Sequence, residues 1–92
     1  MSVDTVNEAV TRVRLRFNKY PDQFSSHGLC KLLAMCNILR DRLMAEDPAG
    51  FEFYIDSILA REPDAADFLL DALFEELNIT DRDQLAVVLA QP

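Results

Sequence analysis

Glycine and proline are scarce in this chain of 92 residues, which contains two of the former and four of the latter. Neither Asn-Gly nor Asp-Gly occurs, so the turn chemistry of a sheet built from hairpins is missing. Apolar residues instead recur at three- and four-residue steps, the spacing of one helix face. We therefore predict an all-α fold, a compact bundle of about five short helices in a single domain over residues 1–92. The predicted helices cover residues 3–20, 26–45, 48–62, 64–77 and 81–90.

Side chains suited to catalysis or to metal binding are also few. His27, Cys30 and Cys36 are three potential ligands, but the paired close spacing of zinc sites is missing. On a helix the two thiols point about 120° apart, so we expect no disulfide between them. His27 follows Ser25 and Ser26 at a helix start, where a solvent-facing residue is the ordinary occupant. No glycine-rich loop is present to hold a phosphate, and we expect no catalytic residue, no metal site and no cofactor.

A long hydrophobic run is missing as well. The longest nearly apolar stretch, residues 29–39, has about half the length of a membrane span and contains Lys31 and Asn37. Residues 2–4 do not begin the cationic and apolar pattern of a secretory signal. We expect a soluble protein of the cytoplasm.

One short motif is similar to that of a known family. Asp56-Ser57-Ile58 is similar to the Asp-Ser-Leu-like motif on which acyl carrier proteins, which are small, acidic and helical, attach a phosphopantetheine arm. In that family the serine opens a helix after a glycine-containing loop. Ser57 lies inside the predicted helix 48–62, so we interpret it as a helix-surface residue.

Charge is plentiful and is divided along the chain. Residues 1–45 hold seven cations against four anions, a net charge of +3. Residues 46–92 hold two cations against twelve anions, a net charge of −10, which brings the total to −7. The two halves either attract each other or meet different partners.

The basic half contains the segment RVRLRF, residues 12–17, in which cations alternate with apolar residues. A helical apolar stripe runs through the same segment, so we predict a helix. Arg12, Arg16 and Lys19 then share one flank and form a candidate basic patch for nucleic acid. Leu15 lies opposite the stripe and is either packed on another element or exposed. The stripe consists of Val3, Val6, Val10, Val13, Phe17 and Tyr20.

Helix boundaries follow from capping residues and prolines. Pro21 is expected to stop the first helix and Asp64 to open the fourth. The segment 26–45 is apolar nearly all round, which predicts a central position. The expected caps are Thr5 with Glu8, Ser25 or Ser26, Asp47 before Pro48, Asn78, and Thr80 with Asp83.

The predicted helix 64–77 carries the sharpest feature, a row of carboxylates without an interleaved lysine. Members of the row are spaced three or four residues apart, about 5–6 Å between neighbours, comparable to phosphates along a nucleic-acid strand. Leucines occupy the opposite side of the helix. The row consists of Asp64, Asp67, Asp71 and Glu75.

Two interpretations of this row stay open. It is either a solvated face that aids solubility or a docking surface for a basic protein groove. In the second case Glu52 and Asp56 extend the surface, and Phe68 supplies a hydrophobic anchor within a charged rim. Phe68 alternatively packs on the helix 48–62.

The leading hypothesis is a non-catalytic protein-binding module. In this hypothesis the protein is an acidic inhibitor or adaptor that occupies a basic, nucleic-acid-handling surface of a partner protein. In charge and size the chain is comparable to small phage or mobile-element proteins that block host enzymes. An alternative is a structural or chaperone-like homodimeric subunit with Leu15, Phe53 and Phe74 buried between copies. A weaker alternative is direct nucleic-acid binding through the basic first helix.

Overall fold

The computed structural model of the chain describes residues 2–19, 22 and 24–90. Within these ranges it contains helices and no strand, which confirms the predicted all-α bundle. Tyr20 and Pro21, the expected end of the first apolar stripe and the expected helix stop, lie outside the described residues. The helices are α1 (Ser2–Lys19), α2 (Ser26–Met44), α3 (Pro48–Arg61), α4 (Pro63–Leu77) and α5 (Arg82–Ala90).

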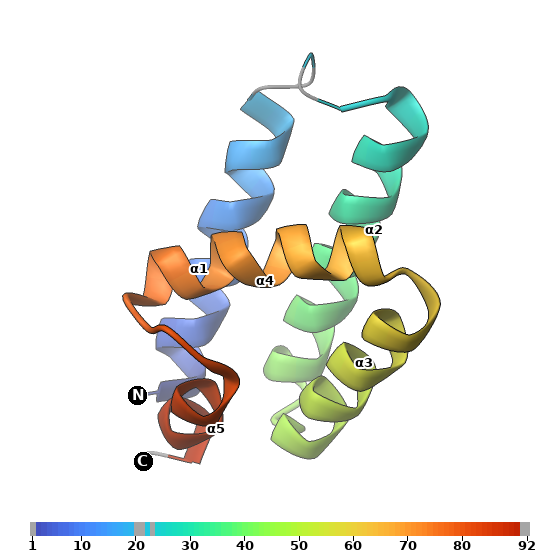
Figure 1. The fold of residues 1–92 in the computed structure, drawn as a ribbon. Coiled ribbons are helices and arrows are strands. Elements are labelled where there is room, and N and C mark those ends of the chain that lie inside the picture. The colour runs from blue at the N-terminus through green and yellow to red at the C-terminus, as the bar shows by residue number, and fades with distance from the viewer. Residues whose placement is uncertain (1, 20–21, 23, 91–92) are drawn as a thin grey trace.

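The two longest helices, α1 and α2, lie side by side, and α4 crosses over both of them (Figure 1). The helix α3 packs against α2 and α4, whereas α5 packs against α1. The described residues fill a volume with principal extents of 38 × 25 × 25 Å. This crossing brings the acidic C-terminal half of the chain onto the basic first helix. None of the described helices combines the length and the apolar character needed to cross a membrane.

The core draws apolar side chains from all five helices. The predicted stripe on α1 is buried at Val6, Val10, Val13 and Phe17, each at most 2% exposed. Burying a side chain of this kind contributes roughly 1.5–3 kcal/mol, so the stripe anchors α1 against its neighbours. The other large side chains that are fully buried are those of Leu39, Leu43, Phe51, Ile55, Ile58, Leu69, Leu73 and Leu85.

The expected central position of α2 is wrong. Its neighbours pack against the side that carries Leu32 and Leu39, and both of these side chains are buried. The opposite side, with Cys30, Ala34 and Ile38, is exposed. Apolar residues on α2 therefore exceed the area that α1, α3 and α4 cover, and α1 occupies the more central place.

Three of the expected caps are confirmed. Ser25 Oγ accepts a hydrogen bond from the Gly28 amide at 3.0 Å, and Asp47 Oδ1 accepts one from the Gly50 amide at 2.9 Å. A Cβ at position 50 would collide with the Asp47 carboxylate, so glycine lets the cap fold over the first turn of α3. Asn78 ends α4 with a φ of 55° and a ψ of 44°, the left-handed conformation.

The other expected helix starts need correction. α1 begins at Ser2, so Thr5 lies within it and does not cap it, and α4 begins at Pro63, one residue before Asp64. The capping box of α5 also lies one residue later than Thr80 with Asp83. Asp81 Oδ1 accepts from the Gln84 amide at 3.0 Å, and Gln84 Oε1 accepts from the Asp81 amide at 3.2 Å. The side chain of each residue thus accepts a hydrogen bond from the backbone amide of the other, which is the reciprocal pattern of a capping box.

Candidate protein-binding surface

The helix α4 has an apolar side and an acidic side. Leu69 and Leu73 on the apolar side are fully buried beneath the crossing, because their spacing places them toward α1, α2 and α3. The carboxylates predicted as a row lie on the exposed side, and each of them is exposed. We call this set the acidic row, and it consists of Asp64, Asp67, Asp71 and Glu75.

Three members of the acidic row have no partner among the described residues. Asp64, Asp67 and Asp71 make neither an ion pair nor a side-chain hydrogen bond within those ranges. Glu75 accepts a hydrogen bond from Arg16 Nη1 at 3.3 Å, but its side chain stays 74% exposed. The row is therefore a largely unneutralised line of negative charge on the surface.

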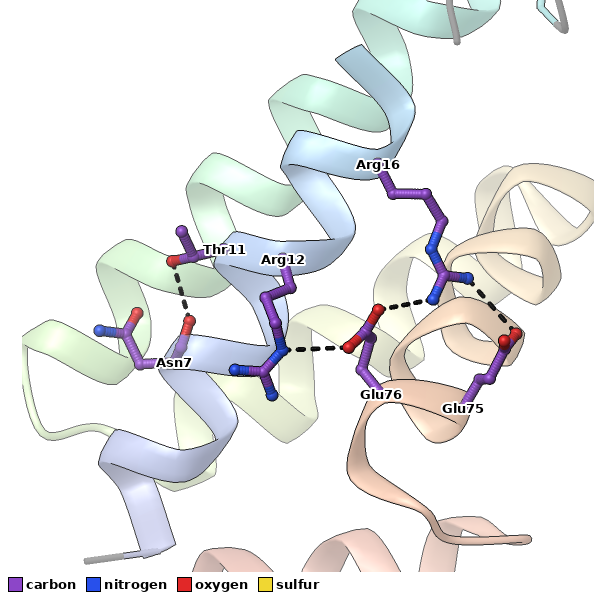
Figure 2. Close-up of polar contacts among 6 residues, drawn as sticks. All are labelled: Asn7, Thr11, Arg12, Arg16, Glu75 and Glu76. Atoms are coloured by element: carbon purple, nitrogen blue, oxygen red, sulfur yellow. Dashed lines mark hydrogen bonds and ion pairs between the residues drawn. The ribbon is translucent and has the colours of Figure 1, made fainter. Parts of the chain in front are cut away.

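The next residue on α4, Glu76, has a different environment that sequence reasoning missed. Arg12 Nε donates to Glu76 Oε2 at 3.0 Å, and Arg16 Nη2 donates to Glu76 Oε1 (Figure 2). The side chain of Glu76 is only 21% exposed. The hydrogen bond from Arg12, joined by the one from Arg16, lowers the pKa of Glu76, although partial burial opposes this shift. The bond to Glu76 likewise raises the pKa of Arg16.

The candidate basic patch is thus largely engaged inside the molecule. Arg12 and Arg16 reach from α1 to α4, and Arg14 Nε donates to Asn37 Oδ1 of α2 at 2.9 Å. Lys19 lies exposed on the last turn of α1. The cations of RVRLRF therefore join α1 to its two main neighbours. The opposite net charges of the two halves were the signal for this pairing.

Glu52 and Asp56, the expected extension of the row, are also paired. Arg82 of α5 donates Nη2 to Glu52 Oε2 at 2.9 Å and lies 2.6 Å from Asp56 Oδ1. Both carboxylates belong to α3, so this cluster joins α3 to α5. Because both of these carboxylates pair with Arg82, they do not extend the unpaired charge of the acidic row.

Phe68 lies beside the acidic row and is 47% exposed. Its ring centroid lies 5.6 Å from that of Phe17 on α1 and 5.2 Å from that of Phe24, which precedes α2. The aromatic contacts of Phe68 are therefore with these rings and not with α3, where one alternative had placed it. Half of the side chain stays available to solvent or to a partner.

A pocket of about 250 Å³ opens where Phe68 meets the end of α1. It combines aromatic rings from three segments with two carboxylates of the acidic row. We call it the Phe68 pocket, and it is lined by Arg16, Phe17, Phe24, Phe68, Asp71, Ala72 and Glu75.

The residues weighed for catalysis or metal binding do not assemble into one site. Cys36 is buried, and this burial raises the pKa of its thiol to about 12, whereas Cys30 is exposed and also free. No group of three or more His, Cys, Asp or Glu side chains suited to a metal ion occurs in the part of the chain that the structure describes. Ser57 donates its hydroxyl to the Phe53 carbonyl at 3.0 Å, one turn earlier in α3.

Comparisons with known proteins yielded no match to a family model, to a curated protein or to a solved structure.

Proposed function

We propose that the protein is a non-catalytic binding module of the cytoplasm, an acidic inhibitor or adaptor that occupies the basic surface of a nucleic-acid-handling partner. One observation carries this proposal. Asp64, Asp67 and Asp71 stand exposed at one-turn steps without a polar partner among the described residues, whereas Arg12 and Arg16 are already engaged by α4.

The physical support is an unrelieved repulsion that a cationic partner would remove. Like charges three or four residues apart on a helix destabilise it by about 0.2–0.5 kcal/mol per pair, and no described cation offsets this between Asp64 and Asp71. From Asp64 to Glu75 the row extends about 16 Å, the rise of roughly five nucleotides in one strand of a duplex. A protein groove that binds phosphates therefore presents cations at a compatible length and sign, which speeds encounter and selects against acidic surfaces.

A charge-reversal pair tests the proposal. D67K/D71K reverses the middle of the row, and E8K/D41K reverses two exposed residues of α1 and α2 as a matched control. Each double variant changes the net charge from −7 to −3, because each reversal adds two units. The proteins serve as bait in a lysate of the native host at low and high salt, followed by mass spectrometry and by association rates with the retained proteins.

We expect wild type and E8K/D41K to retain the same basic proteins, with association rates that fall as salt rises. D67K/D71K should lose these proteins while its far-ultraviolet circular dichroism stays that of a folded helical protein. Equal retention by D67K/D71K and wild type would reject the acidic row as the binding surface.

A second candidate function is a structural or chaperone-like homodimer. Two observations favour it, since Leu15 is 55% and Phe53 is 72% exposed. Phe74, the third residue expected between copies, is half-buried against the core of its own chain. Sedimentation velocity over a range of concentrations tests this candidate, because a species that stays monomeric throughout excludes the homodimer.

Direct nucleic-acid binding through α1 loses support from the same contacts. Arg12 and Arg16 would have to exchange Glu76 and Glu75 for phosphates beside a strongly acidic half of the chain. A gel shift at low salt would revive this alternative.

A further inference from the structure

The base of the Phe68 pocket consists of aromatic rings held by one another. Phe17 is buried beneath, at 1% exposure, and fixes the position of the two rings above it. Phe24 and Phe68 meet edge to face, with an interplanar angle of 87°. Aromatic faces carry partial negative charge and attract cations that approach within about 6 Å. The pocket thus offers a preformed apolar base with an attraction for positive charge.

The rim of the Phe68 pocket is acidic. Asp71 and Glu75 stand one helical turn apart on α4, with Cβ atoms about 5–6 Å from each other. Asp71 has no partner in the described chain, and Glu75 shares only the 3.3 Å contact with Arg16. Arg16 also lines the pocket, but its other terminal nitrogen donates to Glu76, which lies outside the lining. The lining therefore holds two carboxylates against one cation that is already engaged.

Size and charge together define the occupant. A volume of about 250 Å³ is smaller than the 300–1,000 Å³ typical of drug-sized ligand sites, so it suits a single side chain. Arginine combines a planar group that stacks on aromatic rings with several donors that can divide between two carboxylates. The ammonium group of lysine has the same charge, but it is not planar and cannot place donors on two carboxylates while it stacks on a ring.

We infer that the Phe68 pocket receives one arginine side chain of the basic partner, with the guanidinium over Phe68 and hydrogen bonds to Asp71 and Glu75. This inference rests on the proposed function and assigns different roles to different residues of the surface. Asp64 and Asp67, outside the pocket, attract the partner at a distance, whereas Phe68 and Asp71 hold one central residue of it.

The test uses capped arginine, N-acetyl-arginine methylamide, titrated into the isotope-labelled full chain and followed by amide chemical shifts. We expect shifts at Phe68, Asp71 and Ala72 with a Kd on the order of 1–10 mM. Capped citrulline has nearly the same shape without the charge and should leave these amides unmoved. Capped lysine should shift them with weaker affinity.

Two conservative variants locate the contact. D71N and F68L should each weaken capped arginine by about threefold to tenfold. D64N has the same charge change outside the pocket, and F53L alters an exposed phenylalanine of α3, so both controls should change the affinity less than about twofold. Each variant is first checked for a wild-type melting curve.

Shifts outside the pocket, equal binding of capped citrulline, or equal weakening by D64N and D71N would each overturn the inference. Such a result leaves the proposed function standing if D67K/D71K still loses the basic partner. Retention of that partner by D67K/D71K rejects the proposed function itself, whatever capped arginine does.

Discussion

Glu76 and the acidic row belong to the same helix and carry the same charge, yet they have opposite roles in the fold. Glu76 is 21% exposed and accepts hydrogen bonds from Arg12 and Arg16. Asp67 and Asp71, on the outer side of α4, are exposed and unpaired in the described chain. The difference comes from direction, because neighbouring residues on a helix point about 100° apart. Whether a carboxylate of α4 stabilises the molecule is decided by whether it faces α1.

The apolar side of α4 has a third role in the fold. Leu69 and Leu73 are fully buried, so the same fifteen-residue helix carries core residues, a charged contact and an open surface. Stability should therefore depend on the first two sets and hardly at all on the third. Substitutions on each side of α4 test this division.

The largest expected effect comes from the apolar side. Leu69→Ala should reduce the free energy of unfolding by about 3 kcal/mol, because it removes buried methyl groups and leaves a cavity. Asp67→Ala, at an exposed position of the same helix, should change it by less than about 0.5 kcal/mol. Urea unfolding followed by circular dichroism measures both. Similar losses in the two variants would contradict the division of α4 into sides.

An intermediate effect is expected at Glu76. Glu76→Gln should destabilise the protein at neutral pH by about 1 kcal/mol, since it weakens two charge-assisted contacts across α1 and α4. For a 92-residue chain this corresponds to a fall in Tm of about 4–8 °C. Asp83→Asn, at an exposed position of α5, serves as the control.

The pH dependence of this difference has a defined sign. The folded-state pKa of Glu76 lies below its ordinary value of 4.5, so its contribution to stability is fully present above that value. As the pH falls from 4.5 through the folded-state pKa, wild type loses this contribution and Glu76→Gln does not. The gap in Tm between them should close over that interval. A gap that stays constant with pH would show that the charge of Glu76 is not what stabilises the contact.

The smallest effect is expected on the open side, and in the opposite direction. D67N/D71N should raise the free energy of unfolding by about 0.3 kcal/mol, because it removes a repulsion between carboxylates one turn apart. Asparagine and aspartate have similar helix propensities, so little else changes. The gain, measured by thermal melting, should shrink as salt rises. A loss of stability instead would reveal a partner for one of these residues.

Much of the fold follows from signals that are local in the sequence. Ser25, Asp47 and Asn78 mark helix ends because each satisfies backbone groups within a few residues of itself. The stripe on α1 likewise repeats at the helical period, and its members Val6, Val10, Val13 and Phe17 are buried as expected. Thr80 and Asp81 are both residues that can cap a helix, so the sequence alone does not decide which of them caps α5. The predicted start of α5 therefore differs from the observed one by one residue.

The candidate site depends on contacts between distant segments, which local patterns do not encode. The charge difference between the two halves predicts attraction, but not that Glu76 is the residue that meets Arg12 and Arg16. That choice follows from how α4 is rotated about its own axis where it packs on α1. The aromatic contact of Phe68 with Phe24 arises in the same way, because the packing of the helices brings together two residues that lie far apart in the sequence.

The open side of α4 also has a consequence for how such a protein diversifies. Positions 64, 67 and 71 touch no other described side chain through a polar contact and are exposed, so replacing them leaves the core and the ties to α1 undisturbed. Substitutions at these positions can therefore accumulate one at a time during evolution, each in a protein that still folds. This side of α4 can thus change in sequence while the interior of the helical bundle stays constant.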